Sequence, residues 1–244
     1  YPLREMGETF GCQLYIKNEG DNPSGCFKDR ETLMCLLHTL ERRRDKAVIY
    51  SSGNAAASAA LFAQKQRLKL VTFVAGDTYP GKIDFIRRHG SDVIVIGDEH
   101  TTFEEGFRFF AHLNAEEVFL GQGFDNWSVR NPYRVQGDKT TALEMVRQLE
   151  GKSPDYVVVP TGNGSCLAGI WKGFQELKEL ELIDRLPRMV SAGIAQASPV
   201  YVAVRREQTE KPVKLDLSEL DEATAHIGST IVAEEGYDAI EAAR

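Results

Sequence analysis

The chain has 244 residues, of which 42% are hydrophobic and 27% are charged. This length suffices for one large domain or two smaller ones with a sizeable core. A formal net charge of −7 argues against non-specific binding to nucleic acid or to an anionic membrane surface. The four cysteines show no CxxC pairing and no metal-ligand spacing with the five histidines. We therefore expect free thiols, no metal site and a cytoplasmic protein.

The two ends of the sequence suggest a piece of a longer protein. The chain opens at Tyr1 rather than at a methionine, and it stops within a helical pattern over residues 237–244. No signal peptide and no long apolar run is present in the sequence. We expect a fragment that lacks both ends of the parent protein.

Short apolar runs alternate with amphipathic segments along most of the chain. Strands are predicted over residues 14–16, 47–50, 70–75, 92–96, 118–120, 156–159 and 189–194. Between them, helices are predicted over about 29–40, 55–66, 82–89, 103–113, 136–149, 167–180 and 199–206, with a surface loop at 211–221. Because the strands are apolar almost throughout, the pattern indicates an α/β fold of parallel sheets with helices on both faces.

The most unusual stretch is residues 22–30, NPSGCFKDR. Pro23 and Gly25 predict a turn, and the leucines that follow have helical spacing. Lys28 therefore lies where a turn enters the first turn of a helix. The positive end of the helix dipole disfavours a cation there. This position makes Lys28 a candidate reactive amine, although most lysines are solvated surface charges.

Two further loops follow predicted strands and precede helices. Residues 51–54 (SSGN) combine Gly53, which allows close approach of the backbone, with the amide of Asn54; an ordinary helix N-cap is the alternative. Residues 160–166 (PTGNGSC) place two glycines before a helix, where backbone amides can converge on a phosphate. Their spacing matches neither the dinucleotide fingerprint nor a P-loop, which favours a single phosphate over a nucleotide.

In open parallel sheets, ligands bind beyond the carboxyl ends of the strands, where such loops lie. A reactive lysine, a polar amide and a phosphate-binding loop together indicate pyridoxal 5'-phosphate as the cofactor. This cofactor needs a lysine that bonds to it, an anchor for its phosphate and a hydrogen-bonding group beside its ring.

Four segments occur in the order found in threonine synthases: NPSGCFKDR (22–30), SSGN (51–54), NPYRVQGDKT (131–140) and PTGNGSCLAGIWKGF (160–174). The chain resembles this family, which belongs to the fold type II, tryptophan-synthase-β-like group of pyridoxal-phosphate enzymes. The resemblance implies two open parallel-sheet lobes and a homodimer. The larger lobe, which binds the cofactor phosphate and is incomplete at its C-terminus, would comprise residues 1–31 and 127–244, and the smaller mobile lobe residues 32–126.

The resemblance also implies roles for individual residues. Lys28 resembles the catalytic lysine that forms a Schiff base with the cofactor, Phe27 its packing neighbour, and Asn54 the asparagine that hydrogen-bonds the cofactor's 3-hydroxyl. The backbone of five residues would bind the cofactor phosphate: Thr161, Gly162, Asn163, Gly164 and Ser165. The α-carboxylate of the substrate would be received by Ser51, Ser52, Gly53 and Asn54. Arg134 resembles an arginine that binds the substrate phosphate, with a structural ion pair as the alternative.

These roles imply a pyridoxal-phosphate-dependent lyase that converts O-phospho-L-homoserine and water to L-threonine and phosphate. Four residues depart from the family pattern near the substrate side: Cys26 for Ser, Glu31 for Gly, Val129 for Ser and Ala195 for Glu. A β-replacing synthase acting on O-phosphoserine or another amino acid and a non-catalytic homologue therefore stay open, whereas the NPYR segment and the order of the four segments disfavour a hydroxyamino-acid dehydratase. The Ser or Thr that the family places against the pyridine nitrogen lies beyond this chain, so an inactive fragment is a further alternative.

Overall fold

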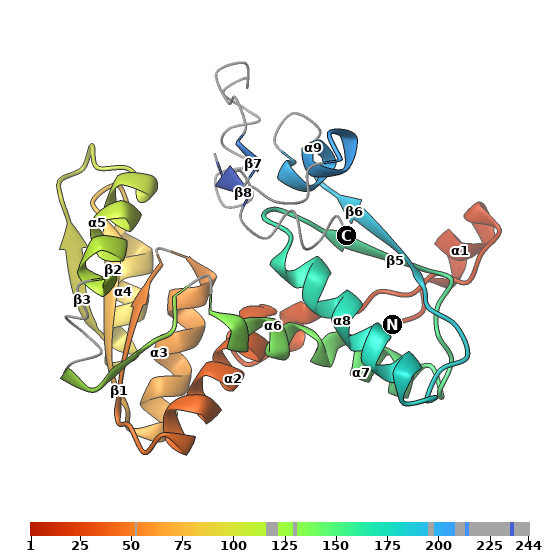
Figure 1. The fold of residues 1–244 in the computed structure, drawn as a ribbon, viewed down its shortest axis with the longest axis horizontal. Coiled ribbons are helices and arrows are strands. Elements are labelled where there is room, and N and C mark those ends of the chain that lie inside the picture. Colours follow the sequence, from red (N-terminus) through yellow and green to blue (C-terminus); the bar gives the residue numbers. More distant parts are fainter. Residues whose placement is uncertain are drawn as a thin grey trace. The chain divides into compact units, whose positions relative to one another are not determined.

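The computed structural model describes residues 1–51, 53–115, 122–128, 131–194, 198–207, 213–214 and 235–236. The chain divides into two compact units, Tyr1–Asn131 and Pro132–Arg244. Each unit has its own parallel sheet (Figure 1). Each unit also has its own hydrophobic core. None of the helices in the described ranges combines the length and apolarity needed to cross a bilayer.

The first unit is built on a four-stranded parallel sheet with the order β3-β2-β1-β4. Its strands are β1 (Lys46–Tyr50), β2 (Lys69–Ala75), β3 (Asp92–Ile96) and β4 (Phe124–Asn126). Its helices are α1 (Arg4–Phe10), the short 3-10 helix η1 (Glu19–Asp21), α2 (Lys28–Glu41), α3 (Asn54–Gln66), α4 (Pro80–Arg88) and α5 (Phe103–Ala115). The central pair, β1 and β2, is in register from Lys46 opposite Lys69 to Tyr50 opposite Phe73.

Two hydrophobic clusters cover the two faces of this sheet. Ala47 and Ile49 of β1 belong to the cluster formed with α2, α3 and α4, whereas Val48 and Tyr50 belong to the cluster that includes Phe110 of α5. Successive side chains of a strand point to opposite faces, so β1 is buried on both sides. This burial explains its uninterrupted apolar sequence.

The second unit contains the two-stranded parallel sheet of β5 (Tyr156–Pro160) and β6 (Arg188–Ala192). It also holds a short antiparallel pair, β7 (Val213–Lys214) and β8 (Glu235–Gly236). Its helices are α6 (Pro132–Asp138), α7 (Thr140–Gln148), α8 (Ser165–Glu179) and α9 (Pro199–Arg205). The core is centred on α8, whose Phe174 is fully buried among residues of α7, β5 and α9.

The α/β architecture with parallel sheets is confirmed, and most elements lie within a few residues of their predicted bounds. The strand predicted at residues 14–16 is wrong: Tyr15 forms only an isolated antiparallel bridge to Pro2, and its side chain is half exposed. The single helix predicted at 136–149 is divided between α6 and α7. α1 and β4 were not predicted. The strand predicted at 118–120 and most of the loop at 211–221 lie outside the described residues.

Candidate functional site

Lys28 is the first residue of α2, at the place where the sequence predicts it. A tight turn precedes it, in which the N–H of Gly25 donates to the carbonyl of Asn22 (2.8 Å) and Gly25 has a φ of +81°. A positive φ is a conformation that glycine adopts without steric cost. The Nζ of Lys28 lies 2.6 Å from Glu31 Oε1 and 4.3 Å from the centre of the Phe27 ring.

Asp29 fixes this turn from the inner side. Its buried carboxylate accepts hydrogen bonds from the Ser24 N–H (2.7 Å), the Ser24 hydroxyl and the Ser58 hydroxyl (2.6 Å). Ser58 belongs to α3, and its hydroxyl also lies within hydrogen-bond distance (2.8 Å) of the hydroxyl of Thr32 in α2. Since Ser58 lies only one turn after Asn54, the first turns of α2 and α3 lie side by side.

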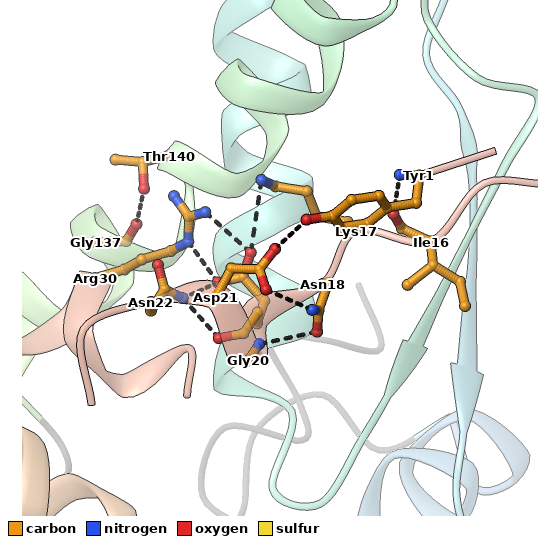
Figure 2. Close-up of polar contacts among 11 residues, drawn as sticks. Tyr1, Ile16, Lys17, Asn18, Gly20, Asp21, Asn22, Arg30, Gly137 and Thr140 are labelled. Atoms are coloured by element: carbon orange, nitrogen blue, oxygen red, sulfur yellow. Dashed lines mark hydrogen bonds and ion pairs between the residues drawn. The ribbon is translucent and has the colours of Figure 1, made fainter. Parts of the chain in front are cut away.

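A second group of polar contacts holds the turn from the outer side (Figure 2). Arg30 donates from Nε to Glu19 Oε2 (2.6 Å) and from Nη2 to Glu19 Oε1 (2.9 Å). Asn22 donates to the carbonyl of Glu19 (3.0 Å) and to its carboxylate (2.8 Å). The paired arginine–carboxylate bonds have a defined geometry. The backbone before Lys28 is therefore tied both to η1 and to α2.

The loop at 51–54 opens α3. Gly53 is the N-cap residue, no side chain in the described ranges caps the helix, and Ser51 Oγ accepts from the Gly53 N–H (3.3 Å). Asn54 is the first helical residue and is exposed. The ordinary alternative, in which a serine or asparagine of this loop is the N-cap of α3, is wrong, since Gly53 holds that position and Asn54 lies inside the helix. Ser52 lies outside the described residues.

The loop at 160–166 opens α8. Thr161 is buried and is tied to the sheet, since its N–H donates to the Ala192 carbonyl and its hydroxyl to the Val159 carbonyl. Gly164 has a φ of +103° and directly precedes α8, which no side chain from the described ranges caps. The first N–H groups of an α-helix have no partner within the helix, and the dipole favours an anion there. This 15-residue helix therefore presents the donors that a phosphate needs.

Arg134 lies in the same unit as the 160–166 loop, on α6. It is buried, and Asp138, also buried, follows one helical turn later. Asp138 in turn contacts α8, because a Cβ at Gly169 would overlap its Cβ. α6 therefore packs tightly against the first turns of α8. Arg134 therefore lies on a helix that is a direct neighbour of α8.

Of the four departures from the family pattern, Val129 and Ala195 lie outside the described residues. Cys26 is partly buried, with Sγ 3.3 Å from Ser24 Oγ. Glu31 is only 1% exposed and forms the ion pair with Lys28. This contact between Glu31 and Lys28 is not among the contacts predicted from the sequence. Its spacing of three residues on a helix is the signal that could have indicated it.

Lys28 and the described residues of the 51–54 loop belong to the first unit, and the 160–166 loop and Arg134 belong to the second. A primary amine can bond to an aldehyde, an exposed amide can hydrogen-bond a ring substituent, and an uncapped helix start can bind a phosphate. The chemistry of this donor set fits pyridoxal phosphate.

Comparison with known proteins agrees with this assignment. The family model described as pyridoxal-phosphate dependent enzyme matches residues 1–243. The chain is 32% identical over 208 residues to the threonine synthase of Methanosarcina acetivorans, covering 84% of this chain and 49% of that protein. It is 34% identical over 179 residues to the threonine synthase of a Bacillus species, covering 73% and 48%. The chain thus spans about half the length of the curated relatives it matches.

Solved structures share the fold. A threonine deaminase isoform 2 from Solanum lycopersicum has a TM-score of 0.76 at 20% identity, covering 99% of this chain and 61% of that one. Serine racemase from Dictyostelium discoideum has a TM-score of 0.76 at 19% identity, covering 99% and 70%. At these identities the likeness concerns the fold alone. The family match over residues 1–243 shows that the chain belongs to the family of pyridoxal-phosphate dependent enzymes.

Proposed function

We propose that the protein containing this chain is a pyridoxal-phosphate-dependent lyase that converts O-phospho-L-homoserine and water to L-threonine and phosphate. The observation that carries the proposal is Lys28 at the start of α2, held in a turn that Asp29 and Arg30 fix from two sides. The relatives named threonine synthase, at 30–34% identity, support the choice of reaction.

Each proposed residue has a distinct task. Bound pyridoxal phosphate would supply an electron sink for the α-carbon of an amino acid. Lys28 would bond to the cofactor and, once released, take the proton from the substrate α-carbon and later return it. Asn54 would hydrogen-bond the ring hydroxyl of the cofactor, and Phe27 would pack beside Lys28. The backbone of residues 161–165 would bind the cofactor phosphate at the start of α8.

The substrate would be held by two groups. The loop of Ser51, Ser52, Gly53 and Asn54 would receive the α-carboxylate, since the first N–H groups of α3 lack a side-chain cap. Arg134 would bind the substrate phosphate, for which a planar guanidinium is well suited. We further propose the lobe division expected from the sequence (1–31 with 127–244, and 32–126), a homodimer and a cytoplasmic location.

Loss of the lysine tests the cofactor assignment. We expect Lys28→Ala to lose the visible absorbance of covalently bound pyridoxal phosphate, whereas Lys82→Ala, which removes an exposed lysine on α4, should keep it. Borohydride reduction followed by peptide mass spectrometry should find the cofactor on Lys28. The assignment fails if Lys28→Ala keeps that absorbance or if another lysine carries the reduced cofactor.

A second candidate reaction is β-replacement on O-phosphoserine. Glu31 keeps this reaction open, because its buried carboxylate lies beside Lys28 where the family pattern has a glycine. Phosphate release from O-phosphohomoserine and from O-phosphoserine, measured side by side on the full-length protein, separates the two reactions. We expect the higher kcat/KM for O-phosphohomoserine, and a preference for O-phosphoserine would replace our assignment with the second.

A further inference from the structure

Glu31 is a carboxylate in an unusual place. It lies in the first turn of α2 with 1% of its surface exposed, and its Oε1 is 2.6 Å from Lys28 Nζ. Acidic side chains are almost never fully buried unless they are paired. The Lys28 side chain is 21% exposed, so solvent reaches the lysine but not its carboxylate partner.

Among the groups around Lys28, Glu31 is the carboxylate that pairs with the lysine ammonium group. The start of α2 carries the positive end of the helix dipole, which opposes an ammonium group. Asp29, the next residue after Lys28, already accepts hydrogen bonds from Ser24 and Ser58. Glu31 supplies the negative charge on one side of the ammonium group, and the face of the Phe27 ring lies 4.3 Å away.

We propose that Glu31 is a positioning residue that holds Lys28 as an ammonium ion in the cofactor-free protein, before any cofactor or substrate is bound. This inference rests on the proposed function of Lys28. An amine attacks an aldehyde carbon through its nitrogen lone pair, which an ammonium ion lacks. The ion pair therefore keeps the lysine unreactive and fixed in place until the proton leaves.

The test is the rate at which an amine-reactive reagent labels Lys28 in the cofactor-free protein at one fixed pH. Labelling is read by peptide mass spectrometry. A Glu31→Gln substitution keeps the shape of the side chain but removes its charge, so we expect labelling of Lys28 to accelerate about tenfold. Lys139, which forms a comparable 2.8 Å pair with Glu176, should be labelled at an unchanged rate.

A matched variant and a wild-type measurement complete the test. Glu176→Gln should accelerate labelling of Lys139 and leave Lys28 unchanged. In the wild-type protein, Lys28 should be labelled about tenfold more slowly than the exposed Lys152. Equal rates for Lys28 and Lys152 would overturn the proposal even if Glu31→Gln failed to fold. A general acceleration at all lysines in Glu31→Gln would overturn it too, because it would show loosening of the fold.

The cofactor gives an independent readout. Glu31→Gln should develop the absorbance of bound pyridoxal phosphate faster than the wild type when the cofactor is added to the cofactor-free protein. If the cofactor bonds to a lysine other than Lys28, the proposed function fails while the labelling result stands. If Lys28 bonds the cofactor but Glu31→Gln changes neither rate, this inference alone fails.

Discussion

A single carboxylate, Asp29, joins three pieces of backbone around Lys28. It accepts from the main chain and side chain of Ser24 in the turn and from Ser58 in α3, and only 3% of its surface is exposed. Hydrogen bonds to a charged acceptor each contribute about 1.5–3 kcal/mol. An asparagine at this position would direct its side-chain N–H₂ group toward the hydrogen-bond donors of Ser24 and Ser58. The orientation of Lys28 therefore depends on a residue that need not touch any ligand.

We expect Asp29→Asn to lower the free energy of unfolding by about 2–4 kcal/mol, because one of its oxygens becomes a donor facing other donors. Urea unfolding measures this loss. Ser24→Ala, which deletes one of the donating hydroxyls, should cost only about 1 kcal/mol. Equal losses for the two variants would show that Asp29 does not organise the turn.

In α2, the sequence pattern predicts the helix but not which of its faces is buried. Its leucines at helical spacing predicted the helix correctly, but Leu33, Leu37 and Leu40 are exposed and only Leu36 is buried. The buried face instead carries polar residues, including Thr39, whose hydroxyl accepts from the Trp127 indole N–H (2.8 Å). Periodicity identifies a helix, but partners distant in sequence decide which face is covered.

The contact between α6 and α8 depends on the absence of a side chain. A Cβ at Gly169 would overlap the Cβ of Asp138 and lie 3.2 Å from the Val135 carbonyl. We expect Gly169→Ala to lower the free energy of unfolding by about 1–3 kcal/mol through overpacking, measured by urea unfolding. Gln175→Ala on the exposed face of the same helix should change it by less than about 0.5 kcal/mol. A neutral Gly169→Ala would contradict close packing of the two helices.

Glu176 joins α8 to the start of α7. The hydrogen bond that Lys139 donates, with a further contribution from Lys172, holds the pKa of the Glu176 carboxyl below its ordinary value of 4.5. A lowered carboxyl pKa stabilises the fold above pH 4.5, and this stabilisation is lost as the pH falls through the lowered value. The pair is partly exposed, so its contribution is small.

We therefore expect Glu176→Gln to cost about 0.5–1 kcal/mol of unfolding free energy near neutral pH. The difference from the wild type should shrink as the pH is lowered below 4.5, because protonation removes the same charge. Urea unfolding at about pH 7 and about pH 3 measures both values. A difference that is the same at the two pH values would mean that the charge of Glu176 is not involved.

At the scale of the whole molecule, the strands and the polar loops could be predicted from the sequence better than the contacts between distant residues. The apolar runs at 47–50, 70–75 and 156–159 became β1, β2 and β5, because buried parallel strands need continuous apolar sequence. β4, with the sequence FDN, is too short and polar to give such a signal. The loops could be recognised from glycines and polar groups after strands. The spacing of Lys28 and Glu31 is visible in the sequence, but the burial of Glu31 is not, since burial depends on packing that one sequence does not show.

The two units have separate hydrophobic cores, and this predicts separate responses to core mutations. The clusters of the first unit lie within residues 35–127, and that of the second lies within residues 142–203. Phe174→Ala would leave a cavity beside α7 and β5 and should cost about 3–5 kcal/mol. Hydrogen exchange should then accelerate in the peptides of α7, α8 and β5 while β1 and β2 keep their protection.

Phe110→Ala is the matched variant in the first unit, because Phe110 is 1% exposed and stacks on Tyr50 at 5.7 Å between ring centres. It should accelerate exchange in β1 and β2 and leave α8 protected. If either substitution accelerated exchange equally in both units, the chain would unfold as one cooperative body. Unit-specific exchange would instead mean that the turn before Lys28 and the 160–166 loop are stabilised independently, so that each keeps its shape when the other unit is damaged.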